Sequence, residues 1–270
     1  MKQNFLAVLM FVIMFAGISL KAPAQTKPFA VGEVLTYEGK ISKIIQGIAV
    51  ADLTFTVDRA PNGVDFLLKT EARSKGSLLR LFRYSFLQQY DSTVESRNFR
   101  ILKTNKYDEQ KERVRTSEAV FDYNNRQVTF VEANPKEPAR PPRKIASEIR
   151  GEVHDMVSGI YALRMLPLAT GKVFEITVSD SGLVYKVPVR VTRREMQKTA
   201  LGKVMCFRVE PEIFGVNRLI EQEGSMFIWI TDDARRIPVR SQIKTKFGTI
   251  DGKIEIRLKQ VGEANGKKTT

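Results

Sequence analysis

Four polar residues at helical spacing are the best candidates for chemistry in this sequence. Asp155 and Ser158 are three positions apart, hence neighbours on a helix surface, and Tyr161 and Arg164 follow at the same step. A serine nucleophile needs a general base and donors for the oxyanion. His154, beside Asp155, would point about 100° away around the helix and could not easily serve Ser158. We favour a structural role, in which Asp155 and Arg164 tie the helix to a sheet by ion pairs, Ser158 allows close packing and Tyr161 closes the core. A hydrolase that uses these residues is the alternative.

Other reactive residue types are sparse. Cys206 is the single cysteine, which excludes an intramolecular disulfide, and its strand-like surroundings favour a small buried hydrophobe over a reactive thiol. With one cysteine and one histidine, a His/Cys zinc site is excluded, and no calcium-loop spacing occurs. Asp232 and Asp233 could be paired carboxylates, but such a pair usually marks a hairpin turn. We therefore expect no catalytic residue, no metal and no cofactor.

The four polar residues belong to the one clear helical pattern in the chain. Apolar residues recur at three- and four-residue steps over 153–166, and Pro167 ends the pattern. Elsewhere, short alternating segments separated by turn residues predict an antiparallel meander, and the proline-rich 134–143 predicts an exposed loop that leads into the helix. The fold class predicted is mainly β: a curved sheet or half-barrel with one principal helix packed across it. The expected strands are 29–39, 48–57, 64–72, 90–106, 107–122, 127–131, 171–179, 183–194, 204–210, 226–231, 237–247 and 253–258.

The first 24 residues have the character of a cleaved export signal. Lys2 gives a positively charged start, 5–20 is an apolar run without charge, and the Ala-Pro-Ala of 22–24 fits a cleavage site. The run is short for a membrane span, so we favour cleavage after Ala24 over an uncleaved anchor. No cysteine follows the cleavage site, which argues against a lipoprotein. We expect an exported, periplasmic protein with no transmembrane segment after cleavage, one β-rich domain over 25–262 and a disordered tail over 263–270.

The chain is strongly basic. The formal net charge is +14, and loss of Lys2 and Lys21 with the signal lowers it to +12. This excess suggests anionic envelope partners such as phosphorylated lipid headgroups, polyanionic glycans or the membrane surface. A well-solvated basic surface would have the same composition. An exported location makes nucleic acid an unsuitable partner.

A helix across the mouth of a curved sheet suggests an apolar ligand site. The segment 77–82 breaks the strand alternation, and together with Phe86 and Leu87 it has more apolar residues than a solvated strand requires. We predict a non-catalytic binding module for a hydrophobic or anionic lipid-like ligand, with a structural or assembly partner of envelope proteins as the alternative. Plain core packing would account for the same residues. The candidate lining residues are Phe55, Phe66, Leu78, Leu81, Phe82 and Trp229.

The sequence also resembles a family of exported bacterial proteins known as domain of unknown function 3108. The matching residues lie in 29–37 at the start of the mature chain, in 155–164, at Arg194, Glu195, Gly202 and Cys206, and in 226–239. The resemblance implies an exported, β-rich fold without an assigned activity. The expected architecture also looks like the half-barrels of periplasmic lipoprotein carriers and outer-membrane lipoprotein receptors, although a fold does not fix a function.

Overall fold

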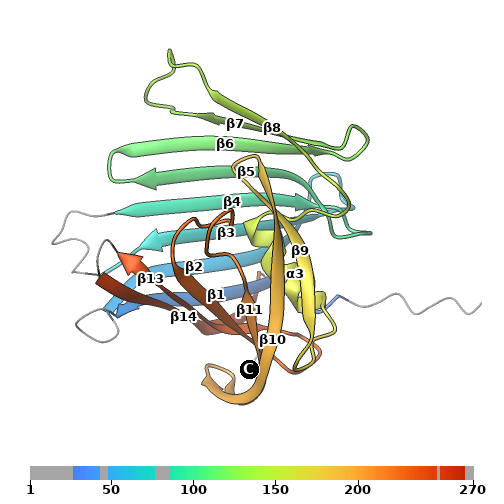
Figure 1. The fold of residues 1–270 in the computed structure, drawn as a ribbon, viewed down its shortest axis with the longest axis vertical. Helices are drawn as coiled ribbons and strands as arrows, with labels where there is room; N and C mark the ends of the chain where they lie inside the picture. Colours follow the sequence, from blue (N-terminus) through green and yellow to red (C-terminus); the bar gives the residue numbers. More distant parts are fainter. Residues whose placement is uncertain (1–26, 43–47, 77–84, 248–249, 265–270) are drawn as a thin grey trace, which may run out of the picture.

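The computed structural model describes residues 27–42, 48–76, 85–247 and 250–264 (Figure 1). These residues form fourteen strands and one helix, α3 (Met156–Met165). The strands are β1 (Glu33–Ser42), β2 (Ile48–Arg59), β3 (Phe66–Ser74), β4 (Phe86–Val94), β5 (Ile101–Gln110), β6 (Arg113–Asp122), β7 (Gln127–Ala133), β8 (Arg143–Glu148), β9 (Val173–Asp180), β10 (Leu183–Thr199), β11 (Gly202–Pro211), β12 (Gly224–Thr231), β13 (Pro238–Phe247) and β14 (Ile250–Glu263).

All fourteen strands belong to one antiparallel sheet that curls but does not close. Its order is β8-β7-β6-β5-β4-β3-β2-β1-β14-β13-β12-β11-β10-β9. Strands that are consecutive in sequence pair with each other except β8 and β9, which are the two edges of the sheet, and β1 pairs in addition with β14. Figure 1 shows β1–β8 as one broad layer, with β9–β14 curling away from it and α3 between the two halves. The predicted curved meander with one helix across it is confirmed.

The open edges of the sheet, β8 and β9, come close at one turn. Gly182, between β9 and β10, has a φ of +81°, and a Cβ added there would lie 2.6 Å from the Cβ of Phe130 and 3.0 Å from that of Ile145. Only glycine allows this close approach together with this backbone conformation. The β9–β10 turn thus rests on β7 and β8 without pairing with them.

Three of the predicted boundaries are wrong for local reasons. The region 90–122 holds β4, β5 and β6 rather than two long strands. The first missed turn is at 95–100, where Phe99 has a φ of +56° and Arg100 pairs with Glu95 at 3.0 Å. The short strand β8 follows the proline-rich loop, which therefore does not lead directly into the helix. At the C-terminus, β14 continues to Glu263, the first residue of the expected tail.

The helix begins three residues later than its apolar pattern suggests. Val153 and His154 precede it in extended backbone, where His154 forms a parallel bridge with Val178 of β9. The amide of His154 donates to Thr177 O at 2.9 Å, and Ser179 donates to His154 O at 2.8 Å. His154 is therefore not on the helix, and its expected direction around a helix axis does not apply.

The core is divided by α3, which packs against both halves of the sheet. Val157, Tyr161 and Ala162 join a cluster with β2–β7, in which Leu68 and Ile101 are fully buried. Leu163 joins a second cluster with β9–β12. Because both sides of the helix are covered by sheet, seven of its ten residues are buried, small and polar ones included.

Candidate functional site

The start of α3 is fixed by a buried carboxylate. Asp155 is the N-cap, and its Oδ1 accepts hydrogen bonds from the amide and the hydroxyl of Ser158, both at 2.7 Å. Its Oδ2 accepts from Ser92 Oγ of β4 and from Thr104 Oγ1 of β5, the latter at 2.7 Å. The Asp155 amide donates in turn to Ser158 Oγ at 2.9 Å, which completes a capping box. Asp155 thus ties the helix to the sheet through hydroxyl groups, and the ion pair expected for it is not found in the described part of the chain.

The last turn of α3 carries a buried cation. Arg164 forms a bidentate ion pair with Glu33 of β1, with Nη1–Oε1 at 2.6 Å and Nη2–Oε2 at 2.8 Å. Its Nη2 also donates to Pro28 O and Arg235 O, at 2.8 and 2.9 Å. Arg164 therefore connects the helix with the N-terminal segment, with β1 and with the β12–β13 turn. The expected ion pair of Arg164 with the sheet is present.

An apolar cavity of about 80 Å³ lies between α3 and the middle of the sheet. Its wall combines strands from both ends of the chain, because β1 pairs with β14. Two tyrosines, Tyr37 and Tyr161, line the cavity, and the hydroxyl group of each is buried. Tyr37 donates a hydrogen bond to Pro238 O at 2.9 Å, whereas the hydroxyl of Tyr161 has no partner in the described residues. Burial raises the pKa of both phenols, so both are neutral at physiological pH. The lining includes Leu35, Tyr37, Leu53, Phe55, Met226, Ile228, Pro238, Ser241 and Ile256 from the strands, and Ile160, Tyr161 and Arg164 from the helix.

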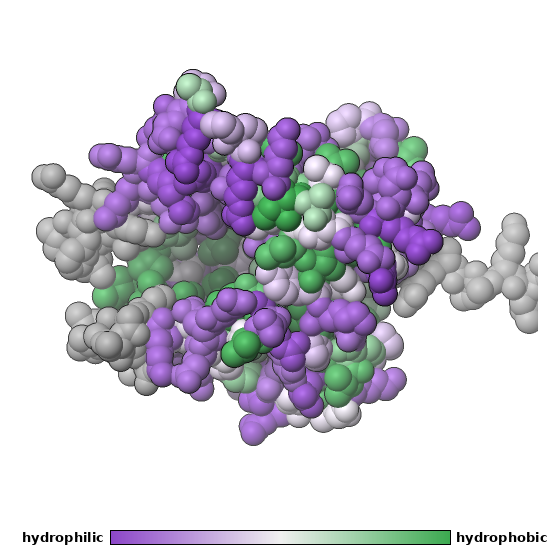
Figure 2. Space-filling view, turned by 45° about the horizontal axis from the view of Figure 1, so that its top comes forward, coloured by the Kyte–Doolittle hydropathy of each residue, from purple (hydrophilic) through white to green (hydrophobic). Residues whose placement is uncertain are grey.

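The apolar wall continues beyond the cavity as one row of side chains across five strands. The register pairs Met226 with Ile243, Ile243 with Ile254, Ile254 with Ile41 and Ile41 with Ile48. All five side chains are half-buried. We call them the rim row. The hydrophobic residues in the hollow between the two halves of the molecule are visible in Figure 2. An apolar surface of this kind, partly open to solvent, is available to a hydrophobic ligand.

The same face becomes polar towards β7. One cross-strand row runs from Leu35 and Phe55 through Thr70 and Tyr90 to Lys106. The Lys106 ammonium lies 5.0 Å from the centre of the Tyr90 ring. Burial raises the pKa of Tyr90. Desolvation acts to lower the pKa of Lys106, but its interaction with the Tyr90 hydroxyl and the negative charges of Asp180 and Asp108 outweigh this, so the pKa of Lys106 is raised. The inner face of the sheet is therefore graded from apolar to charged.

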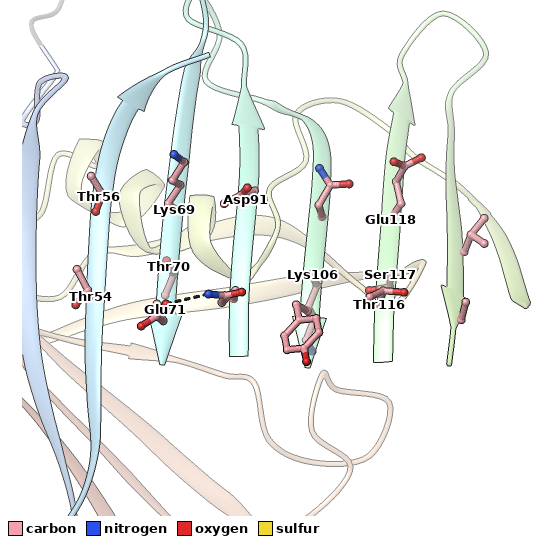
Figure 3. A pocket seen from close by; sticks show the side chains of 15 residues that line it. Thr54, Thr56, Lys69, Thr70, Glu71, Asp91, Lys106, Thr116, Ser117 and Glu118 are labelled. Atoms are coloured by element: carbon pink, nitrogen blue, oxygen red, sulfur yellow. Dashed lines mark hydrogen bonds between the residues drawn. The ribbon is translucent and has the colours of Figure 1, made fainter. Parts of the chain in front are cut away.

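The opposite face of β2–β7 carries a broad polar depression of about 950 Å³ (Figure 3). Its threonines, Thr54 and Thr56, alternate along β2 with the inward-facing Phe55 and Val57. The polar and charged side chains there interact with close neighbours. Gln89 donates a hydrogen bond to Glu71 at 2.9 Å, and the Lys69 ammonium lies 3.2 Å from the Asp58 carboxylate. This depression has the features of the solvated side of a half-buried antiparallel sheet.

The predicted ligand residues do not form one group. Phe55 lines the apolar cavity. Phe66 packs edge-on against Phe29 and Phe99, with ring centres 5.9 and 6.3 Å apart, in the cluster below the helix. Trp229 belongs to a third core cluster and donates its indole N–H to Glu195 at 2.6 Å; it is not part of the cavity wall. The other three, Leu78, Leu81 and Phe82, lie outside the described residues, so their role as ligand contacts stays a prediction.

Most of the cavity wall was missed in the sequence because its residues look like ordinary strand core. Leu35, Leu53, Met226 and Ile256 each occupy an alternating apolar position, which predicts burial but not a partner. Their meeting depends on the β1–β14 pairing, for which the sequence carries no local signal.

The two remaining reactive groups are poorly suited to catalysis. Burial lowers the pKa of His154 to about 4, and its Nδ1 has no partner in the described residues. Cys206 is a buried free thiol, as expected, and burial raises its pKa to about 12.

Among the residues that the structure describes, no three His, Cys, Asp or Glu side chains gather where they could hold a metal ion. The same residues include no helix with the length and apolar character needed to cross a bilayer.

The solved structures that are similar to this chain resemble it in fold alone. The chain is similar to the beta-barrel-like protein of domain of unknown function DUF1849 from Brucella abortus, with a TM-score of 0.58 and 9% identity over 86% of this chain and 98% of that one. A protein from Bacteroides fragilis described as exported, with a YmcC-like fold, covers 89% of this chain and 100% of its own at 9% identity. Its TM-score of 0.34 is too low to bear on the fold.

The sequence comparison identifies the family. No curated protein matches the chain. The family model described as protein of unknown function (DUF3108) matches residues 35–256, which include every residue that lines the apolar cavity. This confirms the resemblance noted in the sequence. The protein therefore belongs to the DUF3108 family, whose function is unknown.

Proposed function

We propose that this protein is a non-catalytic binding module for a lipid-like ligand, whose apolar chain lies in the cavity beneath α3 and along the rim row. The observation that carries the proposal is the continuity of apolar surface from the cavity wall at Ile228 and Ile256 to the half-buried rim row. Burial of that surface by a hydrocarbon chain would contribute about 25 cal/mol per Å² removed from water. We propose that the protein acts after export, in the periplasm, as the basic first residues and apolar run of the chain suggest.

The size of the cavity limits the type of ligand. Its 80 Å³ is well below the roughly 300 Å³ of typical small-molecule sites. A compact ligand would therefore not fit without movement of the wall. A narrow, flexible chain needs less width and can continue along the rim row, which makes an acyl chain the best match.

The geometry gives less support to a hydrolase. Ser158 is fully buried and its hydroxyl is committed to Asp155 on both sides of the capping box. A nucleophile must reach its substrate, and a buried cap residue does not. His154 lies on the preceding extended segment, and no hydrogen bond in the described residues joins its ring to Ser158.

Mass spectrometry of protein purified from a periplasm would test the proposal. We expect a stoichiometric lipid or acyl species in native spectra that disappears after organic extraction. A clean apo protein that also takes up no fatty acid when offered one would contradict it.

Ser241 offers a matched pair of variants. It lines the cavity between its cross-strand partners Ile228 and Ile256, and its buried hydroxyl has no partner in the described residues. Ser241→Leu fills the cavity, whereas Ser241→Ala removes the hydroxyl and leaves the space. We expect Ser241→Leu to lose most of the bound lipid, Ser241→Ala to keep it, and both to fold. Equal lipid content in the two variants would place the ligand elsewhere.

An assembly partner in the envelope is the second candidate. The observation that favours it is the open edge of the sheet at β8, which among the described strands pairs only with β7. A strand of another protein could extend such an edge, although Arg143 and Lys144 on β8 are the kind of residues that discourage it. Cross-linking from β8 that captures one specific envelope protein would favour this function over a carrier.

A further inference from the structure

A second concave site lies on the other side of the sheet, where the tip of the β10–β11 hairpin meets β1, β13 and β14. This crevice has a volume of about 360 Å³, within the usual range for a small-molecule site. Five of its lining residues are cations and one is an acid, Glu38. We call it the basic crevice, and its five cations are Lys40, Lys198, Arg240, Arg257 and Lys259.

The positive charge of the basic crevice is only partly neutralised. Arg240 and Arg257 share one carboxylate, Glu255, each at 2.6 Å, and Lys253 approaches the same group at 3.5 Å. Lys40 lies 3.1 Å from Glu38, which Lys75 also contacts at 3.0 Å. Lys198 and Lys259 are exposed, and within the described ranges neither has an ion-pair partner. The crevice therefore carries an excess of positive charge around a concave surface, which concentrates the field.

Backbone irregularities help to form the crevice. The pairing of β1 with β14 shifts between Thr36 and Tyr37, which leaves Lys259 as the extra residue of a bulge. The pairing of β12 with β13 shifts between Trp229 and Ile230, and Val239 is extra there. Both extra residues line the crevice. Bulges redirect side chains and are common beside functional sites.

One wall of the crevice is rigid. The Arg240 guanidinium lies 4.4 Å from the centre of the Trp229 ring and donates to Gln197 on the hairpin at 3.3 Å. Trp229 is itself held by Glu195 of β10. These contacts attach the hairpin to β12 and β13, so the cations of the crevice are held near one another before any ligand arrives.

We propose that the basic crevice binds a phosphate-bearing anion. Lys198 and Lys259 have no ion-pair partner in the described residues, and their ammonium groups act as compact point charges that suit the dispersed charge of a phosphate. Glu255 contacts Arg240 through Nε and Arg257 through Nη2, so it neutralises part of the arginine charge. Single-stranded nucleic acid would require exposed stacking aromatics, and Trp229 is buried. Arg240 lines both this crevice and the apolar cavity, whereas Lys198 and Lys259 line the crevice and not the cavity.

Calorimetric titration of the full chain with inorganic pyrophosphate at low ionic strength is the first test. We expect saturable binding that weakens at least tenfold in the double variant Lys198→Ala/Lys259→Ala. The matched control is Lys144→Ala/Lys172→Ala, which removes two exposed lysines outside the crevice and changes the net charge equally. We expect the control to stay within twofold of the unmodified protein, and all three to melt at the same temperature.

Vesicles distinguish the source of the phosphate. Co-sedimentation is measured with phosphatidylglycerol vesicles and with phosphatidylcholine vesicles, for the same three proteins. Binding of pyrophosphate alone assigns a soluble phosphate ligand; binding of anionic vesicles that the crevice variant loses assigns a lipid headgroup. The proposal is overturned if the unmodified protein binds neither probe, or if the control variant loses as much binding as the crevice variant.

Discussion

Arg164 and Glu33 form a bidentate ion pair that is almost completely excluded from water, with side chains 1% and 11% exposed. The two residues are 131 positions apart, and the pair joins the helix to the first strand. A buried pair of this kind contributes little compared with an apolar replacement, but it is costly to break because one charge is left without its partner.

Removal of the charge of Glu33 should therefore destabilise the folded protein severely. We expect Glu33→Gln to lower the free energy of unfolding by roughly 3–5 kcal/mol, measured by urea denaturation. The exposed pair Arg150–Glu148 provides the control: Glu148→Gln should leave the free energy of unfolding almost unchanged, because solvent screens this pair. If the two variants lost the same free energy of unfolding, burial of the Arg164–Glu33 pair would not increase the cost of breaking it.

The cap of α3 should also be important for stability. Asp155→Ala removes the N-cap together with the acceptor for Ser92 and Thr104 and leaves buried hydroxyls unpaired. A cap costs about 1 kcal/mol and each orphaned buried donor about 1–3 kcal/mol, so we expect a total loss of several kcal/mol. Ser158→Ala, which leaves both of these hydroxyl contacts with Asp155, should cost less. If Ser158→Ala instead left stability unchanged and abolished a hydrolytic activity, the structural role would be wrong.

The single histidine predicts a specific dependence on pH. Burial lowers the pKa of His154 from 6.5 to about 4, so the folded state favours the neutral ring. The contribution of the neutral His154 ring to the free energy of unfolding is complete above pH 6.5. It is lost as the pH falls towards 4, because the histidine of the unfolded chain takes up a proton at a higher pH than that of the folded chain. We expect a loss of about 2–3 kcal/mol between pH 7 and pH 4.5.

The matching variant is His154→Leu, which cannot titrate. Its free energy of unfolding should fall less over the same pH interval, by the difference assigned to His154. Urea denaturation at the two pH values measures both proteins. A parallel decline in the two would show that other groups cause the acid sensitivity.

Cys206 should be unreactive in the folded protein. Its side chain is fully buried and its thiol pKa is raised to about 12, so the thiolate fraction at pH 8 is roughly a thousandfold below that of a free cysteine. We expect a thiol reagent to label the native protein very slowly and the urea-unfolded protein rapidly. Rapid labelling without denaturant would indicate an open path to β11.

The sequence was informative where local patterns decide the structure. Alternation along β2 predicted that Phe55 and Val57 face inward, and the three- and four-residue steps of Val157, Ile160 and Leu163 predicted α3. The start of the helix was predicted too early because Val153 continues the apolar spacing, although it belongs to the extended segment beside β9. Here the N-cap chemistry of Asp155 outweighed the periodicity.

The apolar cavity was harder to predict from the sequence, because it depends on pairing between strands that are distant in the chain. Trp229 and Ile228 are adjacent apolar residues of β12, and alternation places them on opposite faces without indicating which face holds the cavity. The β1–β14 register settles that question, since it brings Leu35 and Ile256 into one wall. The basic crevice depends on two bulges, and no residue type specifies a bulge.

The pairing of β1 with β14 has a further consequence for how the molecule is assembled. The partners in this ladder, from Glu33–Glu263 to Ser42–Lys253, are separated by 211 to 230 positions. Contacts of such high sequence separation slow folding, because a long loop must be ordered before they form. A chain that emerges from its N-terminus therefore holds β1 as an unpaired strand edge until its last residues appear, and the cavity cannot exist before then.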